Sequence, residues 1–219
     1  MDSSARTKSK PSVKYIQRRF EVLSAAARTF SRLGFQIATL DDVAQELGVT
    51  KPALYYYASS KDELLDACGR MALDALEVAL DTSDQPELDG LGRLCGFFHT
   101  YAEIICQDFG RCLVLTEPRD LAPDSRAANV ARRRALNLAI RRVIKDGVND
   151  GSIARCDERI LANALFDAFN GLSRWFSADG PAPRSVVVDQ YLALFMKGID
   201  GRGATARPRV KARSSGRPD

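Results

Sequence analysis

Residues 39–61 carry side chains that could contact a polyanion such as DNA. The small residues Pro52 and Ala53 would let a helix approach base edges and thymine methyl groups closely, while neighbouring lysine and tyrosine side chains could contact bases or phosphates. Backbone N–H groups at the N-terminus of a helix bind phosphate. The candidate DNA-binding residues are therefore Thr39, Thr50, Lys51, Pro52, Ala53, Tyr55, Tyr56 and Lys61.

Local signals predict that these residues lie on two short helices joined by a tight turn. Thr39 and Asp42 have the spacing of a capping box, which starts a helix. Gly48 supplies the turn, and Thr50 is expected to cap the next helix, with Leu54 facing inward. Such a pair forms a helix-turn-helix, whose second helix can enter the DNA major groove. Helical bundles that never bind DNA also contain such turns, but the basic N-terminal segment favours DNA binding.

Residue types required for catalysis are scarce. The chain has one histidine, His99, and no Ser-His-Asp combination, phosphate-binding loop or cluster with metal-ligand spacing. We therefore expect no enzyme activity, no metal and no cofactor, and we expect His99 in the core or a pocket wall. The cysteines are expected to be reduced and mostly buried, with a redox sensor as the alternative; they are Cys68, Cys95, Cys106, Cys112 and Cys156.

The basic residues are concentrated at the two ends of the chain. The net charge is +4, but residues 1–20 and residues 202–219 each carry +5, which leaves an acidic middle. We expect a disordered basic arm over residues 1–12 and a disordered basic tail over residues 202–219, either of which could contact a polyanion or simply maintain solubility. No apolar run approaches the roughly 18 residues that span a bilayer, and no signal peptide is evident. We therefore expect a cytoplasmic protein with no membrane partner.

Apolar residues at spacings of three and four predict an all-α fold of nine helices. Ser60 and Glu63 should form a second capping box, and the strongly apolar fifth helix should lie centrally in a bundle. Residues 13–60 are expected to form the helix-turn-helix domain and residues 61–201 a helical body. The expected helices cover residues 13–33, 39–47, 51–57, 60–80, 91–108, 111–116, 124–150, 157–177 and 185–199.

Residues 20–65 resemble the DNA-binding head of the TetR family of one-component regulators. The chain departs from the usual family pattern at Ala58, where the family generally has phenylalanine. The resemblance implies an all-helical homodimer that binds operator DNA and a variable body whose small-molecule ligand relieves repression. The residues that carry it are Phe30, Gly34, Phe35, Thr39, Val43, Ala44, Leu47, Gly48, Val49, Lys51, Leu54, Tyr55, Tyr56, Tyr57, Lys61, Leu64 and Leu65.

Under this resemblance the body must bind an effector and dimerise. A pocket for a hydrophobic effector would be lined by Phe97, Phe98, Tyr101, Ile105, Phe109, Leu113, Phe166, Asn170 and Trp175. The apolar stripes of the last two helices would pair with a second copy, or alternatively fill the monomer core. The candidate dimer residues are Phe169, Leu172, Val188, Leu192 and Phe195.

The C-terminal end of the chain is similar to that of TetR-family regulators of fatty-acid and steroid catabolism, which typically sense acyl-coenzyme A thioesters. That similarity implies an acyl-coenzyme A effector, whose phosphates could meet the arginines at 132–134 and 141–142, although these could also form a solvated helix face. The similar residues are Arg174, Trp175, Phe176, Gly180, Pro181, Tyr191, Leu192, Gly198 and Ile199.

Two other functions remain open at this point. A drug-responsive regulator of an efflux pump would use acidic residues for a cationic drug, and Glu103, Asp108 and Asp167 are available in the body. A purely structural dimerisation protein would bind DNA without sequence preference or not at all.

Overall fold

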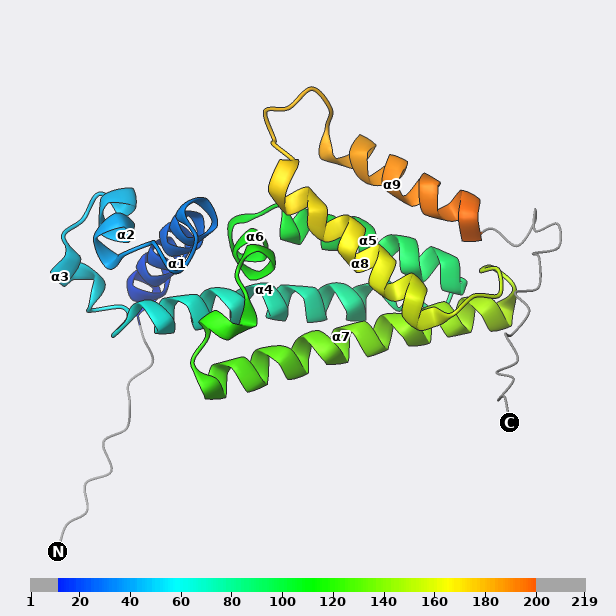
Figure 1. Cartoon of the computed structure of the whole chain (residues 1–219), viewed down its shortest axis with the longest axis horizontal. Coiled ribbons are helices and arrows are strands. Elements are labelled where there is room, and N and C mark those ends of the chain that lie inside the picture. Colours follow the sequence, from blue (N-terminus) through cyan, green and yellow to red (C-terminus); the bar gives the residue numbers. More distant parts are fainter. Residues whose placement is uncertain (1–11, 200–219) are drawn as a thin grey trace, which may run out of the picture.

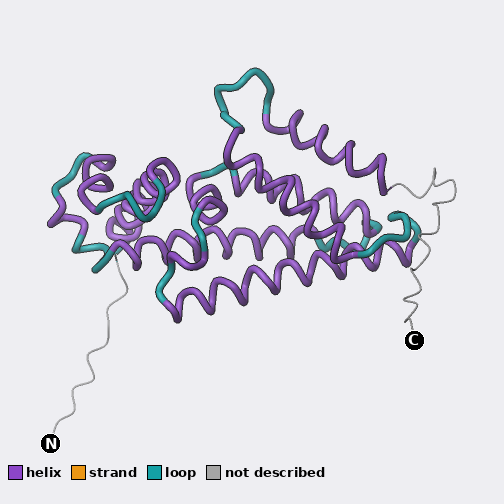
Figure 2. Tube along the Cα trace, viewed as in Figure 1, coloured by secondary structure: helices purple, strands orange, loops and turns teal. Residues whose placement is uncertain are grey.

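The computed structural model describes residues 12–199 and confirms the all-α fold class, with no strand in that part of the chain (Figure 2). The expected arm and tail fall mainly on residues 1–11 and 200–219, which lie outside the described residues. The helices are α1 (Val13–Leu33), α2 (Leu40–Leu47), α3 (Lys51–Leu54), α4 (Lys61–Ser83), α5 (Gly90–Ile105), α6 (Asp108–Leu115), η1 (a 3-10 turn, Pro118–Asp120), α7 (Pro123–Asp150), α8 (Glu158–Trp175) and α9 (Arg184–Ile199).

Helices α1–α3 form a small head at one end of the molecule, and α4 runs from this head into the body (Figure 1). The predicted capping box of α2 is present, because the Thr39 side chain accepts from the Asp42 N–H and Asp42 accepts from the Thr39 N–H. Gly48 adopts the left-handed conformation with φ of 69°, which favours glycine, and so turns the chain towards α3.

The body is a bundle in which α4 and α7 run side by side and α9 lies on the outside (Figure 1). Helix α5 is central, as its apolar residues predict, since Phe97, Phe98 and Ile105 are at most 1% exposed. One unusually close backbone contact fixes α5 against α7: a Cβ atom placed on Gly90 would lie 2.3 Å from the Cα atom of Gly147.

Several predicted boundaries were wrong. Helix α3 ends at Leu54 rather than Tyr57, and α4 continues to Ser83. Helix α5 ends at Ile105 and a new helix begins at Asp108, because Gly110 allows the two segments to pack closely. Thr50 makes no side-chain capping bond to α3. Ser60 caps α4 as expected, but Glu63 accepts from the N–H of Ser59 rather than of Ser60.

The apolar core consists of two clusters that meet at the junction of head and body. The head cluster extends beyond α3 into the first turns of α4, as far as Cys68, and includes Cys112 of α6 and Leu121. On the surface of this junction, Arg28 of α1 pairs with Asp108 of α6 at 2.9 Å, and the ring of Phe20 packs on Phe109. Both α4 and α6 therefore connect the head to the body.

Candidate nucleic-acid interface and body cavity

Helix α3 presents a short exposed face. Leu54 is 1% exposed and packs into the head cluster, as predicted, which orients the helix. Pro52 and Ala53 are exposed on the opposite side, and the Tyr55 and Tyr56 side chains are 52% and 71% exposed. The buried leucine thus leaves small residues and two phenol groups facing outward, where a nucleic acid could contact them.

The two lysines of the candidate interface have protein partners. The Lys51 ammonium lies 2.8 Å from the Asp41 carboxylate, which raises the pKa of Lys51. Both side chains are solvent-exposed, so this pair contributes little stability and a phosphate could replace the carboxylate. Lys61 instead donates to the carbonyl oxygens of Phe35 and Ala38 at 2.7 and 2.9 Å. Lys61 therefore holds the loop before α2 against α4.

The two threonines of the candidate interface differ in their partners. The Thr39 hydroxyl donates to Asp42 at 2.6 Å, and this contact and the Thr39 N–H lower the pKa of Asp42. The Thr50 side chain is exposed and makes no hydrogen bond within residues 12–199. The Thr50 hydroxyl is therefore available to bind a phosphate, whereas the Thr39 side chain caps the N-terminus of α2.

A groove of about 530 Å³ beside the tyrosines contains residues that the sequence analysis missed. Tyr15 of α1 stacks on Tyr57 with ring centroids 5.5 Å apart and meets Tyr56 edge-on at 5.7 Å. The first turns of α1 were expected to be helical, and their basic residues were counted only in the positive charge of residues 1–20, not as individual DNA-binding residues. The groove is lined by Ser12, Lys14, Tyr15, Gln17, Arg18, Glu21, Tyr56 and Tyr57.

The body holds a separate cavity of about 130 Å³ between α4, α5, α6, α7 and α8. Its walls are mainly apolar, and Arg133 is its one charged lining residue. Four of the nine predicted effector residues line it: Tyr101, Leu113, Phe166 and Asn170. Arg133, one of the arginines considered for the phosphates of an acyl-coenzyme A, also lines it, and the residues that were missed are Leu73, Leu76, Val114, Leu136 and Asn137.

The other five predicted effector residues do not line this cavity. Phe97, Phe98 and Ile105 are at most 1% exposed and fill the body core instead. Phe109 packs on Phe20 at the junction with the head, and Trp175 is 55% exposed at the end of α8. Helical spacing brings all of these aromatic residues to the bundle, but it does not distinguish a core position from a cavity wall.

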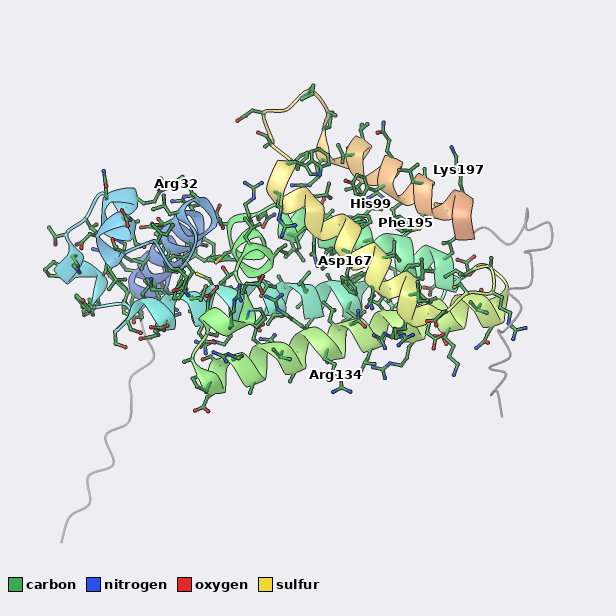
Figure 3. All side chains as sticks on the ribbon, in the orientation of Figure 1. Arg32, His99, Arg134, Asp167, Phe195 and Lys197 are labelled. Carbon is green, nitrogen blue, oxygen red and sulfur yellow. The ribbon has the colours of Figure 1, made fainter. Side chains whose placement is uncertain are left out.

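The three consecutive arginines of α7 have different surroundings. Arg132 pairs with Asp74 and Glu77 of α4 at 2.6 and 2.7 Å. Arg134 is exposed and projects away from the bundle (Figure 3). Of the three, only Arg133 lines this cavity. The alternative that these arginines form a solvated helix face therefore does not hold for Arg133.

The acidic residues that were considered for a cationic drug lie outside the cavity. Glu103 lies 3.7 Å from Arg184, and Asp108 pairs with Arg28. Asp167 is exposed on α8 (Figure 3). His99 is also not a cavity residue; its ring is 44% exposed and lies 3.3 Å from Asp189 of α9.

The predicted dimer residues are placed largely inside one chain. Four of them are at most 6% exposed and belong to the body core, because α9 folds back over α5 and α8: Phe169, Leu172, Val188 and Leu192. Phe195 is partly buried against the same core. At these positions the apolar stripes fill the monomer core, which was the alternative to a dimer interface. The apolar residues that face outward on α8 and α9 are instead Ile160, Trp175, Val186, Leu194 and Met196.

Comparisons with known proteins agree with this two-part architecture. A family model for bacterial regulatory proteins of the tetR family matches residues 22–68. A model for the tetracyclin repressor-like C-terminal domain matches residues 87–199, which is more than half of the chain.

The chain belongs to the TetR family of bacterial transcriptional regulators. It is a DNA-binding repressor of the TetR type and not an enzyme. Within residues 12–199 no helix is long and apolar enough to cross a membrane.

This TetR-family chain is similar to one curated relative over most of its length and shares its fold with further solved structures. The transcriptional repressor KstR2 of Mycobacterium tuberculosis is 28% identical over 192 residues, covering 85% of this chain and 94% of the relative. The structure of that ketosteroid regulator matches with a TM-score of 0.77 and 26% identity, over 84% of this chain and 95% of the other. The structure of AibR with isovaleryl coenzyme A and operator DNA shares the fold, with a TM-score of 0.71 and 20% identity over 81% and 97% of the two chains.

Proposed function

We propose that this protein binds a palindromic operator as a homodimer and is released from it by a hydrophobic effector, an acyl-coenzyme A thioester. The main support for this proposal is the cavity lined by α4, α5, α6, α7 and α8. Two of these helices, α4 and α6, also pack against α1 of the head. The fold shared with AibR, whose structure contains isovaleryl coenzyme A, supports the choice of an acyl-coenzyme A, and the similarity to the ketosteroid regulator KstR2 is compatible with an apolar ligand.

In this proposal α3 reads the operator. Pro52 and Ala53 approach the base edges, Tyr55 and Tyr56 contact bases or phosphates, and Lys51 exchanges Asp41 for a phosphate. Thr39 and Thr50 lie at helix N-termini, where N–H groups can bind phosphate. Lys61 contributes by positioning the loop before α2. Two copies of α3 would occupy half-sites about one helical turn of DNA apart.

Effector binding would act on α3 through the helices that leave the cavity. Leu73 of α4 and Leu113 of α6 line the cavity, and both helices also pack against α1. A ligand that wedges these walls apart would tilt α4 and change the spacing of the two α3 helices in the dimer. For release, the ligand must bind the tilted state more tightly than the DNA-bound state.

We propose the outward apolar residues of α8 and α9 as the dimer interface, with Leu194 at its centre. Leu194 is 70% exposed on one chain, so covering it with a second copy would remove a large apolar side chain from water. Leu194→Glu should convert a species of twice the chain mass into one of the chain mass, measured by light scattering after gel filtration. Val78→Glu, at a 61% exposed position of α4, is the matched control and should leave the mass unchanged. A Leu194→Glu protein that stays dimeric would contradict this interface.

The effector assignment is tested by release from DNA. With an operator selected from random DNA by the protein itself, medium- and long-chain acyl-coenzyme A thioesters should lower the bound fraction in a gel shift. Lipophilic cations should not, because the cavity carries a positive side chain and no carboxylate. Release by the cations and not by the thioesters would instead favour the drug-responsive regulator.

A further inference from the structure

Arg133 forms no ion pair within 4 Å in the part of the chain that the structure describes, although the carboxylate of Glu117 lies near enough to act on it electrostatically. Its Nε atom donates to Oδ1 of Asn129 at 2.7 Å, and its Nη2 atom donates to the carbonyl oxygen of Leu113 at 2.6 Å. A guanidinium has five N–H donors, so three are left without a protein acceptor among residues 12–199. No carboxylate of that part of the chain forms an ion pair with it, whereas the preceding Arg132 has two.

The surroundings of Arg133 disfavour an uncompensated charge. Burial lowers the pKa of Arg133, and the charge of Glu117 only partly opposes that effect. Arginine nevertheless stays protonated in proteins, so the positive charge remains in place. Leaving a partly buried charge unpaired is costly, and such a charge is normally paired. An anion arriving from outside the chain would supply the missing partner.

The other polar groups of the cavity also favour an anion. The Tyr101 hydroxyl donates to Oδ1 of Asn170 at 2.7 Å, which leaves the Nδ2 amide of Asn170 as a donor. Burial raises the pKa of Tyr101, so its phenol stays neutral and adds no negative charge. The cavity therefore combines N–H donors with the apolar side chains of Leu73, Leu76 and Phe166.

We propose that Arg133 anchors an oxyanion of the effector, whose apolar part lies against Leu73, Leu76 and Phe166. The proposal rests on the proposed function and adds the chemical group by which the effector is recognised. The oxyanion has two possible sources, the carboxylate of an apolar acid or an anionic group of a coenzyme A thioester. Arg133 also caps the end of α6 by donating to the carbonyl oxygen of Leu113. This structural role uses only one of the five N–H donors of Arg133, so it does not explain the residue fully.

The proposal is tested by isothermal titration of the full-length protein with decanoate and decanoyl-coenzyme A below their critical micelle concentrations, and with the neutral 1-decanol below its solubility limit. At least one of the two anions should bind the wild type, and Arg133→Gln should weaken that binding at least tenfold, because it removes a charge-assisted hydrogen bond. Arg134→Gln is the matched control, because Arg134 is exposed on the next position of α7, and it should bind as the wild type does. Arg133→Met keeps most of the volume without the charge and replaces Arg133→Gln if that variant fails to fold.

The three probes separate the possible outcomes. Binding of decanoate assigns the oxyanion to a carboxylate, and binding of decanoyl-coenzyme A alone assigns it to the coenzyme. Equal affinities of the wild type and the Arg133 variants, or no binding of either anion by the wild type, would overturn the proposal. Operator release by 1-decanol and by neither anion would overturn the oxyanion contact, while the proposed release by a hydrophobic effector would stand. Arg133-dependent binding of an anion that does not release the operator would support the oxyanion site and reject the proposed effector mechanism.

Discussion

Tyr56→Ala should lower the affinity for the selected operator at least about 30-fold. A side chain that contacts a base or a phosphate contributes about 1–3 kcal/mol, and the proposed dimer loses that contact twice. Because the Tyr56 ring is 71% exposed and packs only edge-on against Tyr15 and Tyr57, its removal should leave the head folded. Fluorescence anisotropy with labelled operator measures the loss, and circular dichroism checks the fold.

Lys51→Met distinguishes a phosphate contact of α3 from a base contact of Tyr56, which follows that helix. Lys51 is proposed to bind a phosphate, so its loss should weaken binding to all DNA sequences alike and reduce the salt dependence of binding. The effect of Tyr56→Ala should be larger for the operator than for unrelated DNA if the ring contacts a base. Val78→Ala removes an exposed apolar side chain from the body, and it should change neither the affinity for DNA nor the salt dependence of binding. Unchanged operator affinity in both head variants would reject α3 as the DNA-reading helix.

Gly90→Ala should destabilise the body by about 3 kcal/mol. The new Cβ atom would lie 2.3 Å from both the Cα and N atoms of Gly147 and 3.1 Å from the carbonyl oxygen of Val143. These are backbone atoms, so no side-chain rotation relieves the clash and the start of α5 must move away from α7. The N–H of Gly90 donates to Asp150 at 2.8 Å, and that bond would also be disturbed.

Gly96→Ala is the matched control on the same helix. A Cβ atom there meets nothing within 4 Å, and alanine favours a helix over glycine by about 0.5–1 kcal/mol. We therefore expect Tm to fall by roughly 6–12 °C in Gly90→Ala and to stay level or rise slightly in Gly96→Ala. Thermal unfolding at equal protein concentration measures both, since dimerisation makes Tm depend on concentration. Equal Tm values in the two variants would show that α5 and α7 are not in close backbone contact.

The sequence by itself determined the head of this protein, because its signals are local. The Thr39–Asp42 capping box and Gly48 each act within a few residues, and Leu54 is the apolar residue that orients α3. Their effect can be predicted without knowing what lies opposite. The start of α1 is the exception, since only the fold brings Tyr15 beside Tyr56 and Tyr57.

Only the tertiary structure decided the roles of the body residues. Successive residues of a helix point about 100° apart, so Arg132, Arg133 and Arg134 face α4, the cavity and solvent, respectively. A run of three arginines does not reveal which one will be turned inward. The same holds for the apolar stripes of α8 and α9: periodicity identifies them, but the fold-back of α9 decides that Phe169 and Leu192 are buried in one chain while Leu194 remains exposed.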